Sequence, residues 1–131
     1  MQSEWSKYLC ILVSGFLEES LRVLLEKYCQ NKASPNIQKF VIKQIDNITN
    51  CKTEKIKRIL GEFSPTWESE FSQKIHEQSK IDGEIKNSID SVIDNRHKIA
   101  HGKSVGMSYS RVSNWYENVK QAVGILEEII K

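Results

Sequence analysis

The 131-residue sequence has few of the features that build a disulfide framework, a zinc site or a membrane span. It holds three cysteines, Cys10, Cys29 and Cys51, an odd number with no C-x-x-C pair. This favours buried thiols in a reducing cytoplasm over disulfides or zinc. The apolar run over residues 8–13 is too short to cross a bilayer, and no signal-peptide pattern is evident. We therefore expect a cytoplasmic location and no contact with a membrane.

Strand-like alternation, internal repeats, low-complexity tracts and linkers are also absent. The net charge of +2 neither demands nor excludes a nucleic-acid partner. Hydrophobic residues make up 39% and charged residues 27%, as in ordinary globular proteins. A chain of this length forms one domain by default, and it gains from burying more surface in an oligomer. We expect residues 1–131 to form a single all-α domain, a compact bundle of about five helices with long first and last helices.

Apolar residues at three- and four-residue spacing predict the helices. The first is predicted over residues 3–29, followed by a loop from Gln30 to Ser34. A second loop is predicted from Lys103 to Met107, before the last helix. The predicted helix starts share a residue that commonly caps or begins a helix, and they are Ser34-Pro35, Thr53, Ser64-Pro65, Asp82, and Ser108 or Ser110.

Three polar residues, Glu18, Glu19 and Ser20, interrupt the apolar stripe of the first helix. Most carboxylates on helices face solvent, so we expect the same here. The alternative is that Glu18 or Glu19 orients an active-site arginine or histidine from across the bundle.

Strong chemistry is concentrated in one stretch, from Ile93 to Gly102. Arg96, His97 and His101 lie on the last one and a half turns of the helix predicted there, and Gly102 stands where a helix stops. The two histidines are about 40° apart around the axis and about 6 Å apart along it, so they share a face. Arg96 lies about 140° from His101, so its long side chain must curl to reach the same site.

These residue types suit cleavage of RNA without a metal. That reaction needs a base for the ribose 2′-hydroxyl, an acid for the leaving 5′-oxygen and a cation beside phosphorus. Histidine suits the first two roles because it titrates near neutrality. Arginine suits the third because it stays charged and grips two phosphate oxygens. Arg96 and His101 are therefore the candidate catalytic residues, and one copy of the pair is sparse for acid plus base.

The stretch Arg96-His97-Lys98-Ile99-Ala100-His101 resembles the R-x(4–6)-H signature of the HEPN domains. Its Ile-Ala-His-Gly ending is close to the form in the prokaryotic RiboL-PSP-HEPN branch. The resemblance implies an all-helical homodimer that forms a composite site and cleaves RNA without a metal or cofactor, leaving a 2′,3′-cyclic phosphate and a 5′-hydroxyl. Many members are toxins or defence effectors, which implies a possible antitoxin partner. His97 takes the polar position after the arginine, to which the family gives a supporting role.

Residues near the motif are candidates for holding RNA. Lys98, Lys103 and Arg111 are candidate contacts to the RNA backbone, and Tyr109 is a candidate for stacking on a base. The two lysines are equally well explained as solvated side chains. Another HEPN subgroup, linked to a nucleotidyltransferase antitoxin, has tyrosine two residues after the motif histidine. Lys103 occupies that position here, which argues against such regulation.

Three other interpretations of the motif remain open. The chain can be a non-catalytic HEPN module that binds RNA, a nucleotide or a protein. His97 and His101 have the spacing of zinc ligands on a helix, but no third ligand or adjacent glutamate is indicated. The motif can also be structural, with His101 as a favourable charge at a helix end and Arg96 paired with Asp94 or Asp90.

Overall fold

The computed structural model describes residues 2–103 and 105–131, and the side chains from Glu4 onward. Ser104, which belongs to the predicted loop from Lys103 to Met107, lies outside the described residues. The described part contains six α-helices and no strand. The all-α prediction is therefore confirmed, with six helices in place of about five. The helices are α1 (Gln2–Lys32), α2 (Pro35–Ile45), α3 (Thr53–Phe63), α4 (Pro65–Gln78), α5 (Glu84–Ala100) and α6 (Tyr109–Ile129).

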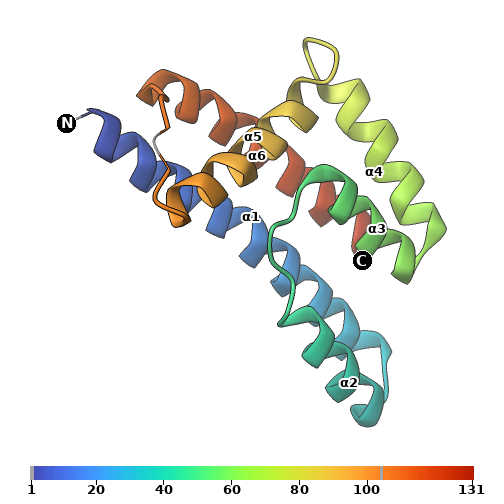
Figure 1. Ribbon diagram of the computed structural model, residues 1–131. Helices are drawn as coiled ribbons and strands as arrows, with labels where there is room; N and C mark the ends of the chain where they lie inside the picture. Colours follow the sequence, from blue (N-terminus) through green and yellow to red (C-terminus); the bar gives the residue numbers. More distant parts are fainter. Residues whose placement is uncertain (1, 104) are drawn as a thin grey trace.

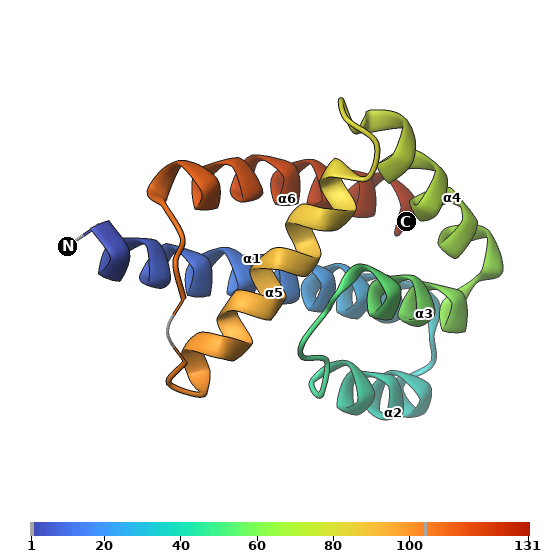
Figure 2. The same ribbon diagram turned by 45° about the horizontal axis from the view of Figure 1, so that its top comes forward.

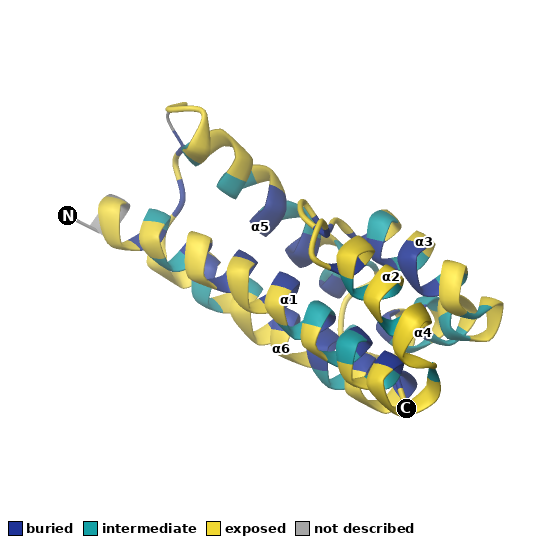
Figure 3. Ribbon diagram, turned by 90° about the horizontal axis from the view of Figure 1, so that it is seen from below, coloured by how far each residue is buried: buried dark blue, intermediate teal, exposed yellow. Residues whose placement is uncertain are grey.

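The centre of the fold is a three-helix unit of α1, α5 and α6, each packed against the other two. Helix α5 crosses the two long helices obliquely, and its C-terminal end extends away from α6 (Figures 1 and 2). The buried faces of the helices meet along this crossing (Figure 3). The largest fully buried side chains of the unit are aliphatic, namely Leu17, Leu21, Leu25, Ile85, Ile89, Ile93, Ile125 and Leu126.

Two buried polar contacts fix how α5 sits on its neighbours. The Asn118 amide of α6 donates to the Ser88 hydroxyl of α5 at 2.8 Å. The Cys10 thiol of α1 donates to the Val92 carbonyl of α5 at 3.5 Å. Because buried polar groups are costly without partners, these contacts favour one register of the three helices.

The remaining helices pack around the central unit unequally. Helices α3 and α4 pack against each other, and α4 also packs against α6. Tyr28 of α1, Phe63 and Trp67 form an aromatic cluster where α1 meets them, with ring centroids of Tyr28 and Trp67 4.8 Å apart. Helix α2 packs only against α1 among the described helices, and it projects from the bundle beside the C-terminal half of α1 (Figure 1).

Most predicted helix starts are confirmed. Ser34 and Ser64 are N-caps with a proline at the first helical positions. Ser108, rather than Ser110, caps α6, because its hydroxyl accepts from the Arg111 amide at 3.1 Å.

Three predictions about boundaries are wrong. Helix α1 continues to Lys32, because nothing before the Ser34-Pro35 break opposes helix geometry. The N-cap of α5 is Gly83 and not Asp82, and its φ of 75° suits glycine. The N-cap of α3 is Lys52, so Thr53 is the first helical residue.

The expectation that Glu18 faces solvent is also wrong. Glu18 is 4% exposed, whereas Glu19 is exposed and pairs with Arg22 at 2.9 Å. Glu18 and Ser14, one turn apart, each have a buried side-chain oxygen with no hydrogen-bond partner among the described residues. The polar residues that interrupt the apolar stripe therefore lie on two sides of α1, with Glu18 in the interior and Glu19 at the surface.

Candidate functional site

The C-terminus of α5 is closed by a glycine-dependent cap. The Gly102 amide donates to the Ile99 carbonyl at 3.0 Å, and the Lys103 amide donates to the Lys98 carbonyl at 2.9 Å. This pair of bonds is the Schellman arrangement, which needs a residue with positive φ at Gly102, where φ is 70°. The cap holds His101 as the last residue of the helix, the C-cap.

The two motif histidines lie in contact, as their spacing predicts. The ring centroids of His97 and His101 are 4.3 Å apart with an interplanar angle of 62°. Both residues are exposed. Two imidazoles that are in contact with each other and open to solvent can exchange protons with a ligand bound over them.

Arg96 points toward the α2–α3 loop. Its Nη1 donates to the Asn50 Oδ1 at 3.2 Å. Arg96 also lies near the Cys10 thiol of α1. Burial raises the pKa of Cys10 to about 11, and the positive charge of Arg96 acts in the opposite direction. No hydrogen bond or ring contact among the described residues joins Arg96 to His101, so the structure brings His97 and His101 together and leaves Arg96 to one side.

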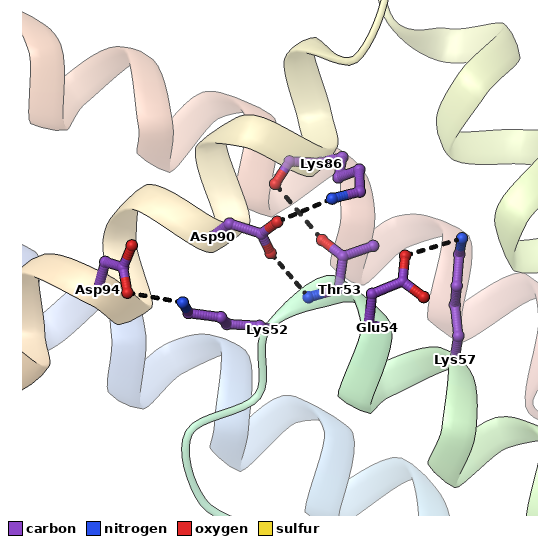
Figure 4. Close-up of polar contacts among 7 residues, drawn as sticks. All are labelled: Lys52, Thr53, Glu54, Lys57, Lys86, Asp90 and Asp94. Carbon is purple, nitrogen blue, oxygen red and sulfur yellow. Dashed lines mark hydrogen bonds and ion pairs between the residues drawn. The ribbon is translucent and has the colours of Figure 1, made fainter.

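The two acidic residues expected to neutralise Arg96 are bound elsewhere. Asp94 accepts from the Lys52 Nζ at 2.6 Å. Asp90 contacts the Lys86 Nζ at 3.1 Å and accepts from the Thr53 amide at 2.9 Å (Figure 4). The ion-pair interpretation of Arg96 is therefore wrong for the described residues, because both carboxylates pair with lysines instead.

These contacts join the start of α3 along one side of α5. The Asp90 carboxylate accepts from the first amide of α3. In the loop just before this amide, Lys52 lies beside Asp94 and Asn50 lies beside Arg96. The hydrogen bond from Lys52 lowers the pKa of the Asp94 carboxyl, so this pair stays ionised at neutral pH. The loop is thereby held in place next to the motif.

Asn50 and Lys52 also line a hollow of about 270 Å³ together with Ile93, Asp94 and His97. Neither residue was predicted from the sequence, where both belong to a polar stretch that contains no recognised motif. Asn50 has a φ of 54°, a conformation that asparagine tolerates better than most side chains. An asparagine in a short polar loop is a weak signal by itself, and only the tertiary contact with Arg96 identifies it.

The other predicted site residues do not bond to the motif, and the start of α6, which carries Tyr109 and Arg111, lies away from the C-terminal end of α5 (Figures 1 and 2). Lys98, Lys103, Tyr109 and Arg111 are exposed, and no side-chain hydrogen bond or ion pair joins any of them to the motif within the described ranges. Tyr109 instead lines a shallow hollow with Trp5 of α1.

The two carboxylates that were candidates for orienting the site lie elsewhere. Glu19 pairs with Arg22. Glu18 lies near Cys51. Burial of the Cys51 thiol is the main cause that raises its pKa to about 11, and the negative charge of Glu18 is the second. No hydrogen bond or ion pair among the described residues joins either carboxylate to the motif.

No group of three or more His, Cys, Asp or Glu residues in residues 2–103 and 105–131 is arranged to hold a metal ion. No helix in this part of the chain is long and apolar enough to cross a membrane.

Comparison with known proteins identifies one family. The family model described as RiboL-PSP-HEPN matches residues 2–131, nearly the whole chain. No curated protein matches the chain significantly, and no solved structure does.

Proposed function

Because the chain belongs to the RiboL-PSP-HEPN family, we propose that it is a metal-independent endoribonuclease. The observation that carries the proposal is the exposed pair of His97 and His101 beside Arg96, whose charge no carboxylate of the described residues neutralises. An exposed histidine can transfer protons, and a guanidinium without an ion pair can bind the phosphate.

The proposed reaction is an internal transesterification of RNA. One imidazole takes the proton of the ribose 2′-hydroxyl, and the 2′-oxygen forms a bond to phosphorus. The bond from phosphorus to the 5′-oxygen breaks, and a second, protonated imidazole gives its proton to that oxygen. Arg96 stabilises the extra negative charge on the phosphoryl oxygens. The products are a 2′,3′-cyclic phosphate and a 5′-hydroxyl, and no metal or cofactor takes part.

We assign the acid and base roles to two copies of His101, one from each protomer of a homodimer. His97 contacts His101 and supports its ring. A composite site also explains why Arg96 and His101 diverge within one chain, because the arginine of one protomer can serve the histidine of the other. We propose that Lys98, Lys103 and Arg111, which are exposed, hold the RNA backbone, and that the exposed Tyr109 stacks on a base.

In a cell, this activity fits a toxin of a toxin–antitoxin pair or a phage-defence effector. We propose a single HEPN domain over residues 1–131 that acts on cytoplasmic RNA and is restrained by a protein antitoxin. Expression without the antitoxin should then arrest growth.

The deciding experiment compares motif variants in RNA cleavage and growth arrest. His101→Ala should lower cleavage by roughly 10²–10⁴-fold, because it removes the proton-transfer group. Arg96→Ala should do comparable damage, and His97→Ala should be milder. Lys98→Ala is the matched control on the same turn, and it should weaken RNA binding in a salt-dependent way while leaving the chemical step nearly unchanged. Cleavage by the wild type should persist in excess EDTA.

Two results would contradict the proposal. A folded His101→Ala protein that cleaves RNA and arrests growth like wild type would make the motif structural. Loss of wild-type activity on chelation, restored by magnesium or zinc, would contradict the mechanism. The divergence of Arg96 from His101 favours one second candidate, a non-catalytic HEPN module that binds RNA, a nucleotide or a protein, and a monomeric protein without ribonuclease activity would put it first.

A further inference from the structure

An open groove lies between α2 and α3. It has a volume of about 550 Å³. Six apolar side chains line it, namely Phe40, Val41, Ile45, Ile48, Ile59 and Phe63. Helices α2 and α3 do not pack against each other, so the groove remains open between them.

The apolar face of α2 at this groove is unusually exposed to solvent. Phe40, which lines the groove, is 65% exposed, and Ile37, one turn earlier and outside the lining, is 55% exposed. Ile45 is the only buried residue of the helix. An amphipathic helix gains most of its stability from burying its apolar face, so one that leaves a phenylalanine in water indicates a surface with a missing partner.

The charges around the groove are unevenly distributed. Two basic residues of α3, Lys55 and Arg58, line it. The only acidic residue in its lining is Glu62, in the last turn of α3 next to Phe63. Arg58 is exposed and forms no ion pair within the described residues. The groove is therefore basic at the end near the α2–α3 loop.

We infer that this groove binds an amphipathic, acidic helix from a partner protein. The apolar side chains of that helix, at positions i, i+3, i+4 and i+7, fill the space between α2 and α3 and cover Phe40. Its carboxylates meet Lys55 and Arg58, which fixes the direction in which it lies.

The test uses two synthetic amphipathic helices of about 18 residues, five turns long, with the same apolar face. One has glutamates and the other lysines along the flank of that face. The acidic helix should bind about tenfold tighter or more than the basic one, measured by fluorescence anisotropy. Amide chemical shifts should change in α2 and α3. The assay requires no ribonuclease activity, so it is independent of the proposed reaction.

Variants locate the bound helix. Phe40→Ser should weaken binding of the acidic helix by about tenfold or more, and Arg58→Glu should reverse the preference for the acidic helix. Both residues are exposed, so neither change disturbs the core. Ile81→Ser is the matched control, because Ile81 is an equally bare apolar residue, 72% exposed, in the turn before α5.

Four outcomes would overturn the inference. The first is that neither helix binds, and the second is that both bind equally well to the wild type. The third is displacement of the acidic helix by RNA, which would make the groove a nucleic-acid site. The fourth is conversion of a dimer to a monomer by Phe40→Ser, which would show that a second copy of the chain covers the groove.

Discussion

At the scale of single residues, Asn50 determines where Arg96 points. Its side chain accepts from the guanidinium, and its backbone lies in the left-handed region that glycine adopts without strain. These two roles can be separated by substitution. Glycine keeps the turn and removes the acceptor, whereas aspartate keeps the acceptor in nearly the same shape.

We predict that Asn50→Gly lowers kcat for RNA cleavage by about ten- to a hundredfold, because Arg96 loses its fixed position. The melting temperature should change little. Asn50→Asp should retain much of the activity. The side-chain NMR signal of Arg96 should shift in Asn50→Gly whether or not the protein cleaves RNA. Equal activity and an unchanged Arg96 signal in the glycine variant would leave Asn50 with a role in the turn alone.

The cysteine side chains give a prediction about pH. Burial raises the pKa of Cys10 and of Cys51 from 9.0 to about 11. The folded protein therefore keeps protons that the unfolded chain releases above pH 9. This contribution to the free energy of unfolding is fully present below about pH 9 and is lost as the pH rises toward 11.

We expect these thiols to resist a disulfide reagent at about pH 8 in the native state and to react in urea. The free energy of unfolding should fall between about pH 9 and pH 11, and Cys51→Ala should reduce that fall. Rapid labelling of Cys10 and Cys51 in the folded protein would contradict their burial.

At the scale of elements, the carboxylate of Asp90 fastens α3 to α5. It accepts from the first amide of α3, a position usually capped by a residue of the same helix. Because α3 begins at this contact, the placement of Asn50 and Lys52 beside the motif depends on it.

Asp90→Ala should lower the free energy of unfolding by about 1 kcal/mol, as removal of a helix cap does. Asp94→Ala is the control, since it removes an acid one turn away whose pair with Lys52 is about half exposed. Exposed pairs contribute roughly 0–1 kcal/mol, so its effect should be smaller. Urea unfolding of both variants decides between them. An equal or smaller loss for Asp90→Ala would mean that its bond to α3 contributes no more than a surface ion pair.

The helices were predictable from sequence where the signal is local. The apolar period of α1 and α6, the two Ser-Pro pairs and Gly102 each act within a few residues, and the structure confirms them. The side chain that accepts from the first amide of α3 was not predictable, because it belongs to Asp90, 37 residues away. The boundary at Gly83 was missed because an aspartate beside it also has a high capping preference.

The candidate site divides in the same way. The contact of His97 with His101 follows from their four-residue spacing on a helix, and it is confirmed. The partner of Arg96 was missed because the nearest carboxylates in sequence, Asp94 and Asp90, were its candidate partners. In the structure these two bind Lys52 and Lys86 instead. The side of α1 that Glu18 occupies depends on packing against the α2–α3 loop, which the pattern of one helix does not determine.

At the scale of the whole molecule, one surface of α1 is too apolar for an isolated chain. Trp5 is 63% exposed, Tyr8 54% and Leu12 49%. The stripe continues through Phe16, whose ring contacts Tyr116 of α6 at 6.0 Å between centroids. A continuous apolar surface of this kind usually marks an interface between proteins.

A second copy of the chain is the occupant that also serves the proposed chemistry. One chain supplies one Arg96 and one His101 to a reaction that needs an acid, a base and a cation. Two copies related by a two-fold axis supply two of each, and such an interface uses the same surface on both protomers. Assembly through the α1 stripe would therefore bury the apolar surface and supply the missing groups in one step.

We predict a homodimer whose mass by light scattering is twice that of one chain at micromolar concentration. Leu12→Glu should give a folded monomer, because a charge in an apolar interface has no partner. The same variant should lose RNA cleavage although Leu12 lies outside the motif. Ile81→Glu, at another exposed apolar position, should remain dimeric and active. If Leu12→Glu is monomeric and still cleaves RNA, one protomer must carry the whole site, and Arg96 must then leave Asn50 to reach His101.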